Sequence, residues 1–92
     1  MRNTVARNNL ACLQYAEGDH EDAGRTFRDL AEDDSLTNAL FNYAVYLDEI
    51  EHDPEQAYRY YRRYIEEGGE AADQARELVR VKEEVFGFEP EG

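Results

Sequence analysis

The chain has 92 residues, which is enough for one small domain. It carries 22 Asp and Glu residues against 10 Lys and Arg, a formal net charge of −12, which disfavours binding to nucleic acid or to an anionic membrane. We therefore predict no nucleic-acid partner and no membrane partner. No apolar run approaches the ~20 residues of a membrane-spanning helix, and no signal peptide is visible. We expect a cytoplasmic protein, or a periplasmic one if the sequence is a fragment of a longer chain.

The cysteine and the basic residues narrow the possibilities further. Cys12 is the one cysteine, so the chain can form neither an internal disulfide nor a multi-cysteine metal site. Lys82 is the only Lys, and the other basic residues are all Arg. Excess carboxylates with almost no Lys fit a halophilic source, where salt screens repulsion, and equally fit an ordinary acidic surface.

Apolar residues are spaced as in α-helices throughout, and no useful stretch alternates with the period of a β-strand. We expect five helices over about residues 4–17, 20–33, 36–51, 54–67 and 70–86, with a frayed tail at 87–92. The apolar residues of these helices are, in chain order, Ala6, Leu10 and Leu13; Ala23, Phe27, Leu30 and Ala31; Leu40, Tyr43, Ala44, Leu47 and Ile50; Ala57, Tyr58, Tyr61, Tyr64 and Ile65; and Ala75, Leu78, Val79 and Val85.

The helix starts are marked by capping residues. Asp19 and Ser35 are predicted to cap the second and third helices. The fourth helix has the clearest start, since Asp53 is a predicted N-cap, Pro54 takes the first helical position, and Gln56 can complete a capping box.

The chain contains an internal repeat. The triplet beginning at Asn9 reappears 33 residues later at Asn42, and the pattern from Ala23 to Arg28 reappears 34 residues later from Ala57. The repeating unit is therefore a helix hairpin of ~34 residues that occurs twice.

This unit resembles the tetratricopeptide repeat. The matching positions are Arg7, Leu10, Ala11, Gln14, Ala23 and Phe27 in the first copy, and Leu40, Tyr43, Ala44, Leu47, Ala57 and Tyr61 in the second. The resemblance implies an all-α solenoid in one domain: repeat 1 at 4–35, repeat 2 at 36–69 and a capping helix at 70–86. It also implies that small residues face each other where the helices of a hairpin cross, as Ala11 and Ala23 would.

Three features depart from the family pattern. Arg7 and Gln14 replace a large apolar and an aromatic residue, and no proline closes either repeat. Gly24 leaves a gap where the second copy has Tyr58.

The resemblance further implies a concave groove lined by the first helix of each hairpin. Its predicted lining is Val5, Asn8, Asn9, Cys12 and Tyr15, then Asn38, Phe41, Asn42, Val45 and Asp48, and finally Arg76 and Arg80. The Asn9 and Asn42 amides suit an extended peptide backbone, and Phe41, Val45 and Cys12 would give apolar pockets. The alternative is that these Asn residues only reflect the common repeat sequence, and that the two Arg residues pair with local carboxylates. A family clamp for a C-terminal carboxylate is not expected, because Asp73 and Glu77 stand where cations belong.

The sequence offers little for catalysis. His20 and His52 lie among acidic residues in exposed turns, but consecutive ligands do not suit a metal. No glycine-rich phosphate loop or nucleophile–base pair stands out, so we predict neither an enzyme nor a cofactor. Tyr60 and the arginines at 59, 62 and 63 face outward; we interpret them as balancing the acidic surface, with a convex contact as the alternative.

We predict a protein-interaction module that binds a neutral or basic peptide or protein segment in the groove. The alternative is a structural fragment that forms homo-oligomers through the unpaired faces of its terminal helices.

Overall fold

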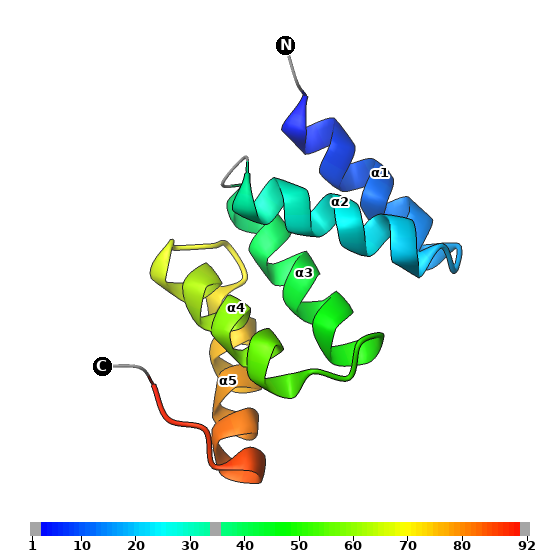
Figure 1. The fold of residues 1–92 in the computed structure, drawn as a ribbon. Helices are drawn as coiled ribbons and strands as arrows, with labels where there is room; N and C mark the ends of the chain where they lie inside the picture. Colours follow the sequence, from blue (N-terminus) through cyan, green and yellow to red (C-terminus); the bar gives the residue numbers. More distant parts are fainter. Residues whose placement is uncertain (1–2, 34–35, 91–92) are drawn as a thin grey trace.

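The computed structural model describes residues 3–33 and 36–90. These residues form five α-helices and no β-strand: α1 (Thr4–Ala16), α2 (His20–Glu32), α3 (Thr37–Glu49), α4 (Pro54–Glu66) and α5 (Ala72–Phe86). Each helix packs against the next in the chain, so the molecule is an elongated stack of 39 × 26 × 20 Å (Figure 1). The predicted all-α fold of consecutively packed helices is confirmed.

The helix ends differ slightly from the predicted ones. The third helix begins at Thr37 instead of residue 36 and ends at Glu49 instead of residue 51. The fifth begins at Ala72, two residues later than expected, because Gly69 to Ala71 form a turn after α4. Such shifts of one or two residues are usual at helix ends.

The predicted caps are present in part. The Asp53 carboxylate accepts a hydrogen bond from the backbone N–H of Gln56 at 3.2 Å, and Pro54 takes the first helical position as expected. Asp19 stands at the N-cap position of α2, but its side chain makes no capping hydrogen bond. The sequence prediction missed Asn3, whose side chain caps α1 by accepting from the N–H of Ala6 at 2.9 Å. The predicted cap Ser35 lies outside the described residues.

Small residues sit at the centre of the hairpins. Ala11 and Ala23 in the first hairpin, and Ala44 and Ala57 in the second, are all 0 % exposed. Because alanine has the shortest apolar side chain, a fully buried pair allows two helix backbones to approach closely. The burial of these four residues agrees with the hairpin crossings that the resemblance implies.

The gap predicted at Gly24 is filled. A Cβ atom at Gly24 would overlap the ring of Tyr46, which lies on α3 and is 8 % exposed. The missing side chain therefore makes room for a tyrosine of the following helix, and the prediction of a gap was wrong.

The C-terminal tail is partly packed. Gly87 takes the left-handed conformation with φ 74°, which turns the chain back after α5. The Phe88 ring then lies 5.3 Å from the ring of Tyr58 on α4 and 5.3 Å from that of Phe86. The prediction of a frayed tail was therefore wrong for Phe88.

The stripe predicted on the first helix is a surface feature. Leu10 and Leu13 are each 56 % exposed, because the opposite side of α1, which carries Ala11 and Asn8, packs on the rest of the stack.

Candidate functional site

The first helices of the hairpins are linked by a buried amide. The Asn42 side chain on α3 donates to the Asn8 Oδ1 atom on α1 at 3.0 Å and to the Cys12 Sγ atom at 3.5 Å. Asn8 is buried at 7 % exposure and Asn42 is half-buried, so this hydrogen bond is partly shielded from water. The structure thus brings three predicted site residues together at the α1–α3 contact.

Two further polar contacts join these helices along the chain. The Tyr15 hydroxyl of α1 donates to the Glu49 carboxylate at the end of α3 at 2.6 Å. The Lys82 ammonium of α5 pairs with the Asp48 carboxylate of α3 at 2.8 Å. These contacts fix the order α1, α3, α5 along one side of the stack. The exposed surface of these three helices, which carries Asn9, Cys12, Asn38, Asn42 and Val45, is called the first-helix face below.

Two of the predicted site residues with side-chain amides lie outside the core. Asn9 on α1 and Asn38 on α3 are both exposed, as is Cys12, while Val45 is half-buried. Partial burial raises the pKa of the Cys12 thiol, so this residue is a small polarisable side chain rather than a reactive thiolate.

Phe41 contributes to packing instead of an open pocket. Its ring stands edge-on to Tyr61 at 5.4 Å and to Tyr64 at 5.2 Å, both on α4. The predicted apolar pocket at Phe41 is therefore occupied by the molecule's own tyrosines, which the periodicity of α3 alone could not show.

Arg76 and Arg80 do not lie on the first-helix face. Lys82 marks the side of α5 that meets α3, and Arg76 and Arg80 are more than ~100° away from it around the helix. Arg76 instead lines a hollow of about 320 Å³ beside Arg62 of α4. Both residues are exposed and paired with carboxylates of their own helix, Arg76 with Asp73 at 2.8 Å. The alternative interpretation as local ion pairs is the one that the structure supports.

On α5, apolar residues lie on the first-helix face, where Arg76 and Arg80 were predicted. Leu78 and Val85 lie within ~60° of Lys82 around the helix, and Val85 is 67 % exposed. The sequence analysis assigned both to the apolar side of the fifth helix, since spacing cannot tell an exposed from a buried apolar stripe. The seven-residue separation of the two was the signal that they share one face.

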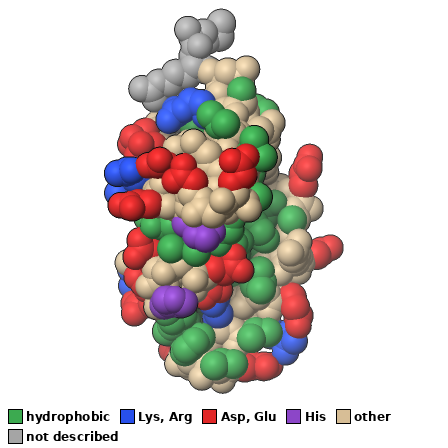
Figure 2. Space-filling model, turned by 90° about the vertical axis from the view of Figure 1, so that its right-hand side faces the viewer, with side chains coloured by type: hydrophobic (Ala, Val, Ile, Leu, Met, Phe, Trp, Pro, Cys, Tyr) green, Lys and Arg blue, Asp and Glu red, His purple; other side chains and the backbone are tan. Residues whose placement is uncertain are grey.

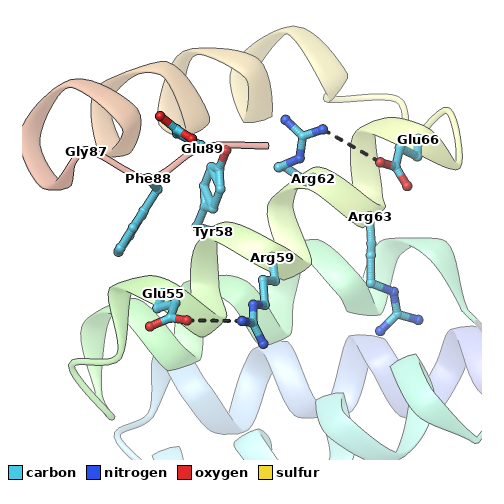
Figure 3. A pocket seen from close by; sticks show the side chains of 9 residues that line it. All are labelled: Glu55, Tyr58, Arg59, Arg62, Arg63, Glu66, Gly87, Phe88 and Glu89. Atoms are coloured by element: carbon cyan, nitrogen blue, oxygen red, sulfur yellow. Dashed lines mark hydrogen bonds and ion pairs between the residues drawn. The ribbon is translucent and has the colours of Figure 1, made fainter. Parts of the chain in front are cut away.

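A larger hollow lies elsewhere, between α4 and the C-terminal tail. It has a volume of about 720 Å³ and is lined by Glu55, Tyr58, Arg59, Arg62, Arg63, Glu66, Gly87, Phe88 and Glu89 (Figure 3). Its arginines pair with carboxylates: Arg59 with Glu55 at 3.1 Å and Arg63 with Glu32 of α2 at 2.7 Å. These pairs support the interpretation of this arginine group as internal charge balance, because three carboxylates line the hollow with three arginines.

The two histidines lie one above the other on the side of the stack where the hairpin turns lie (Figure 2). The His20 ring packs 4.8 Å from that of Tyr15. Within residues 3–33 and 36–90, no group of three or more His, Cys, Asp or Glu side chains is placed to hold a metal ion.

The fold and this face together define a class: a stack of antiparallel helix hairpins with a polar, amide-bearing side. Comparisons with protein-family models, curated proteins and solved structures return no match for the chain. Among the described residues, no helix is both long and apolar enough to cross a membrane.

Proposed function

We propose that this chain is a protein-interaction module of the tetratricopeptide-repeat type, which binds an extended peptide across the first-helix face. The observation that carries the proposal is the fixed Asn42 amide with the exposed Asn9 and Asn38 amides on neighbouring helices. An amide can both donate to and accept from a peptide backbone, so three of them in a row suit a ligand without regular structure.

The position of Asn42 defines which part of it can meet a ligand. Its nitrogen donates to Asn8 and Cys12, so both amide hydrogens serve the α1–α3 contact. Its carbonyl oxygen remains an acceptor, which fits the N–H group of a peptide bond. Holding the amide in place in advance lowers the entropy that binding costs.

Charge and apolar surface indicate the chemistry of the peptide. The net charge of −12 attracts basic segments, admits neutral ones and repels acidic ones. Leu78 and Val85 beside Lys82 give an apolar contact at the α5 end of the face. The proposal assigns no catalytic reaction and no cofactor, and it places the protein in the cytoplasm.

The experiment is selection of binding peptides from a random display library, followed by titration of the best peptide. The double variant Asn9→Ala, Asn38→Ala removes two exposed amides without touching the core. Each lost hydrogen bond is worth about 1 kcal/mol, so we expect Kd to rise by about tenfold or more.

Gln56→Ala is the matched control, since it removes an exposed amide from α4, on the other side of the hairpin. It should leave Kd unchanged. Equal affinity of the double variant and the wild type would show that the peptide binds elsewhere.

A further inference from the structure

The outer side of α1 is an apolar surface on an otherwise charged molecule. The large hydrophobic residues that are exposed in the described chain lie on the two terminal helices: Val5, Leu10, Leu13, Val81, Val85 and Phe86. Helix α1 also contains no Asp or Glu, although the chain has 22 of them. Ala6, Leu10 and Leu13 form one stripe on this helix and are all exposed. This stripe is called the α1 seam below.

The repeat shows that this kind of surface is normally covered. The positions 33 residues after Ala6, Leu10 and Leu13 lie on α3, where Ala39 and Tyr46 are buried and Tyr43 is half-buried. Tyr46, the counterpart of Leu13, fills the space at Gly24 of α2. The α1 seam is thus the side of a first helix that receives another helix. In the described chain nothing covers it.

The other end of the stack differs. The outward side of α5 carries Asp73, Glu77, Arg80 and Glu84, all exposed and joined in ion pairs such as Arg80–Glu84 at 2.8 Å. A surface of charged residues that pair with one another is stable in contact with water and does not require a protein partner. Val81 and Val85 are exposed beside these charges, within ~80° of Glu77 around the helix, so this end of the stack mixes apolar and charged residues, whereas α1 carries no carboxylate. The contact between two copies is therefore sought at α1.

The spacing of the α1 seam fits pairing with an identical helix. Asn3, Ala6, Leu10, Leu13 and Glu17 are separated by three, four, three and four residues, which is the spacing of a coiled-coil seam. In an antiparallel pair, this spacing places Leu10 of each copy opposite Leu13 of the other, in two equivalent layers. The same register brings Arg7 of each copy near Glu17 of the other, at both ends of the seam.

We propose that two copies of this chain form an antiparallel dimer through their α1 seams. A second copy is favoured as the occupant because the seam is complementary to itself: the leucines of each copy meet those of the other, and Arg7 of each copy lies near Glu17, the one carboxylate of the seam, on the other copy. The Arg7–Glu17 register adds opposite charges at the two ends, in addition to the contact that Arg7 makes within its own chain. A single short helix pair is a small interface, so the dimer is weak and salt strengthens it by screening the remaining charge.

Sedimentation equilibrium of the 92-residue chain tests the dimer, at rising protein concentration in low and in high salt. We expect the mass to rise from one copy to two, with a tighter Kd in high salt. Leu13→Glu buries an unpaired carboxylate at the centre of the contact and should weaken the dimer by at least about a hundredfold. Val81→Glu is the matched control: it places the same charge on an exposed apolar residue of α5 and should leave the dimer intact.

A charge exchange tests the register. Arg7→Glu alone should weaken the dimer, and Arg7→Glu combined with Glu17→Arg should restore it, because the opposite charges again meet across the seam. Circular dichroism of each variant confirms that the helices remain folded. A wild-type chain that stays monomeric at every concentration and salt, or one that Leu13→Glu leaves dimeric, would overturn the proposal. Peptide binding to the first-helix face is measured separately, so the two proposals can fail independently.

Discussion

Tyrosine rings and glycines fit together at two places in this small core. A Cβ atom at Gly24 would overlap the Tyr46 ring, and one at Gly69 would overlap the Tyr64 ring. Gly24 lies inside α2, where glycine costs roughly 1 kcal/mol relative to alanine. Gly24 therefore lowers the helix propensity of α2 but leaves room for the large Tyr46 side chain of α3.

Gly24→Ala should destabilise the protein in spite of alanine's higher helix propensity. Overlap in a packed core costs about 1–3 kcal/mol, which exceeds the propensity gain, so we expect a net loss of about 1 kcal/mol in the free energy of unfolding. Urea denaturation followed by circular dichroism measures it. In a Tyr46→Leu background the same substitution should cost less; an equal cost in both backgrounds would mean that the Tyr46 ring is not the obstacle.

At the scale of single residues, some features could be predicted from the sequence and others could not. The buried alanines, the Asp53 cap and Pro54 followed from residue type and spacing, because these depend on local backbone geometry. The direction of Phe41 did not, since the side of α3 that meets α4 depends on how the hairpins stack. The fit of Tyr46 to Gly24 involves residues 22 positions apart, which no local pattern reveals.

At the level of helices, polar contacts hold the first helices in order. The residue Lys82 is 7 % exposed. Its ammonium group pairs with the carboxylate of Asp48, whose side chain is 31 % exposed. The two partners therefore differ in how far water can reach them. Removing one or the other leaves charges with unequal access to solvent.

Asp48→Ala should cost more stability than Lys82→Met. The first leaves a buried ammonium without its carboxylate, at about 2–4 kcal/mol, whereas the second keeps the aliphatic stem and leaves a carboxylate that water can solvate, at about 1 kcal/mol. Urea midpoints of the two variants give the comparison. Equal losses, or a larger one for Lys82→Met, would contradict this account of the α3–α5 contact.

The helices themselves were predictable, but their relative rotation was not. Five amphipathic segments with caps and glycines gave the element order and the bounds to within about two residues. Arg76 and Arg80 lie away from the side of α5 that meets α3, because the fifth helix is turned relative to the repeat register. Lys82, which the sequence analysis noted only as the single lysine, marks the side that meets α3.

Across the whole molecule, excess carboxylates are used as acceptors for tyrosine hydroxyls. Four such bonds are 2.6–2.7 Å long: Tyr15–Glu49, Tyr46–Glu51, Tyr58–Glu83 and Tyr60–Glu32. Three of them join different helices. The acidic composition is thus partly structural, and it makes the fold sensitive to ionisation of the tyrosines.

Stability should fall at alkaline pH. The hydrogen bond to Glu51 raises the pKa of Tyr46 to about 12, and partial burial, followed by the bond to Glu32, raises that of Tyr60 to about 12. In the unfolded chain these groups ionise near pH ~10, so their contribution is complete below that pH and is lost as pH rises toward 12.

Urea midpoints measured at a series of pH values from about 9 to 11 check this dependence, with tyrosinate absorbance as the readout of ionisation. Tyr60→Phe removes one hydroxyl and should make the decline shallower. A midpoint that does not change over this range would show that the hydroxyl–carboxylate bonds do not couple ionisation to folding.

The most direct test of the central claim is the position of a bound peptide, mapped by nuclear magnetic resonance on the full chain with a peptide selected as above. The account predicts that the side-chain amide signals of Asn9 and Asn38 shift on binding, together with the methyl groups of Val45 and Val85. Shifts confined to Arg59, Arg63 and Phe88 would instead place the ligand in the hollow between α4 and the tail, and would contradict recognition by the first helices.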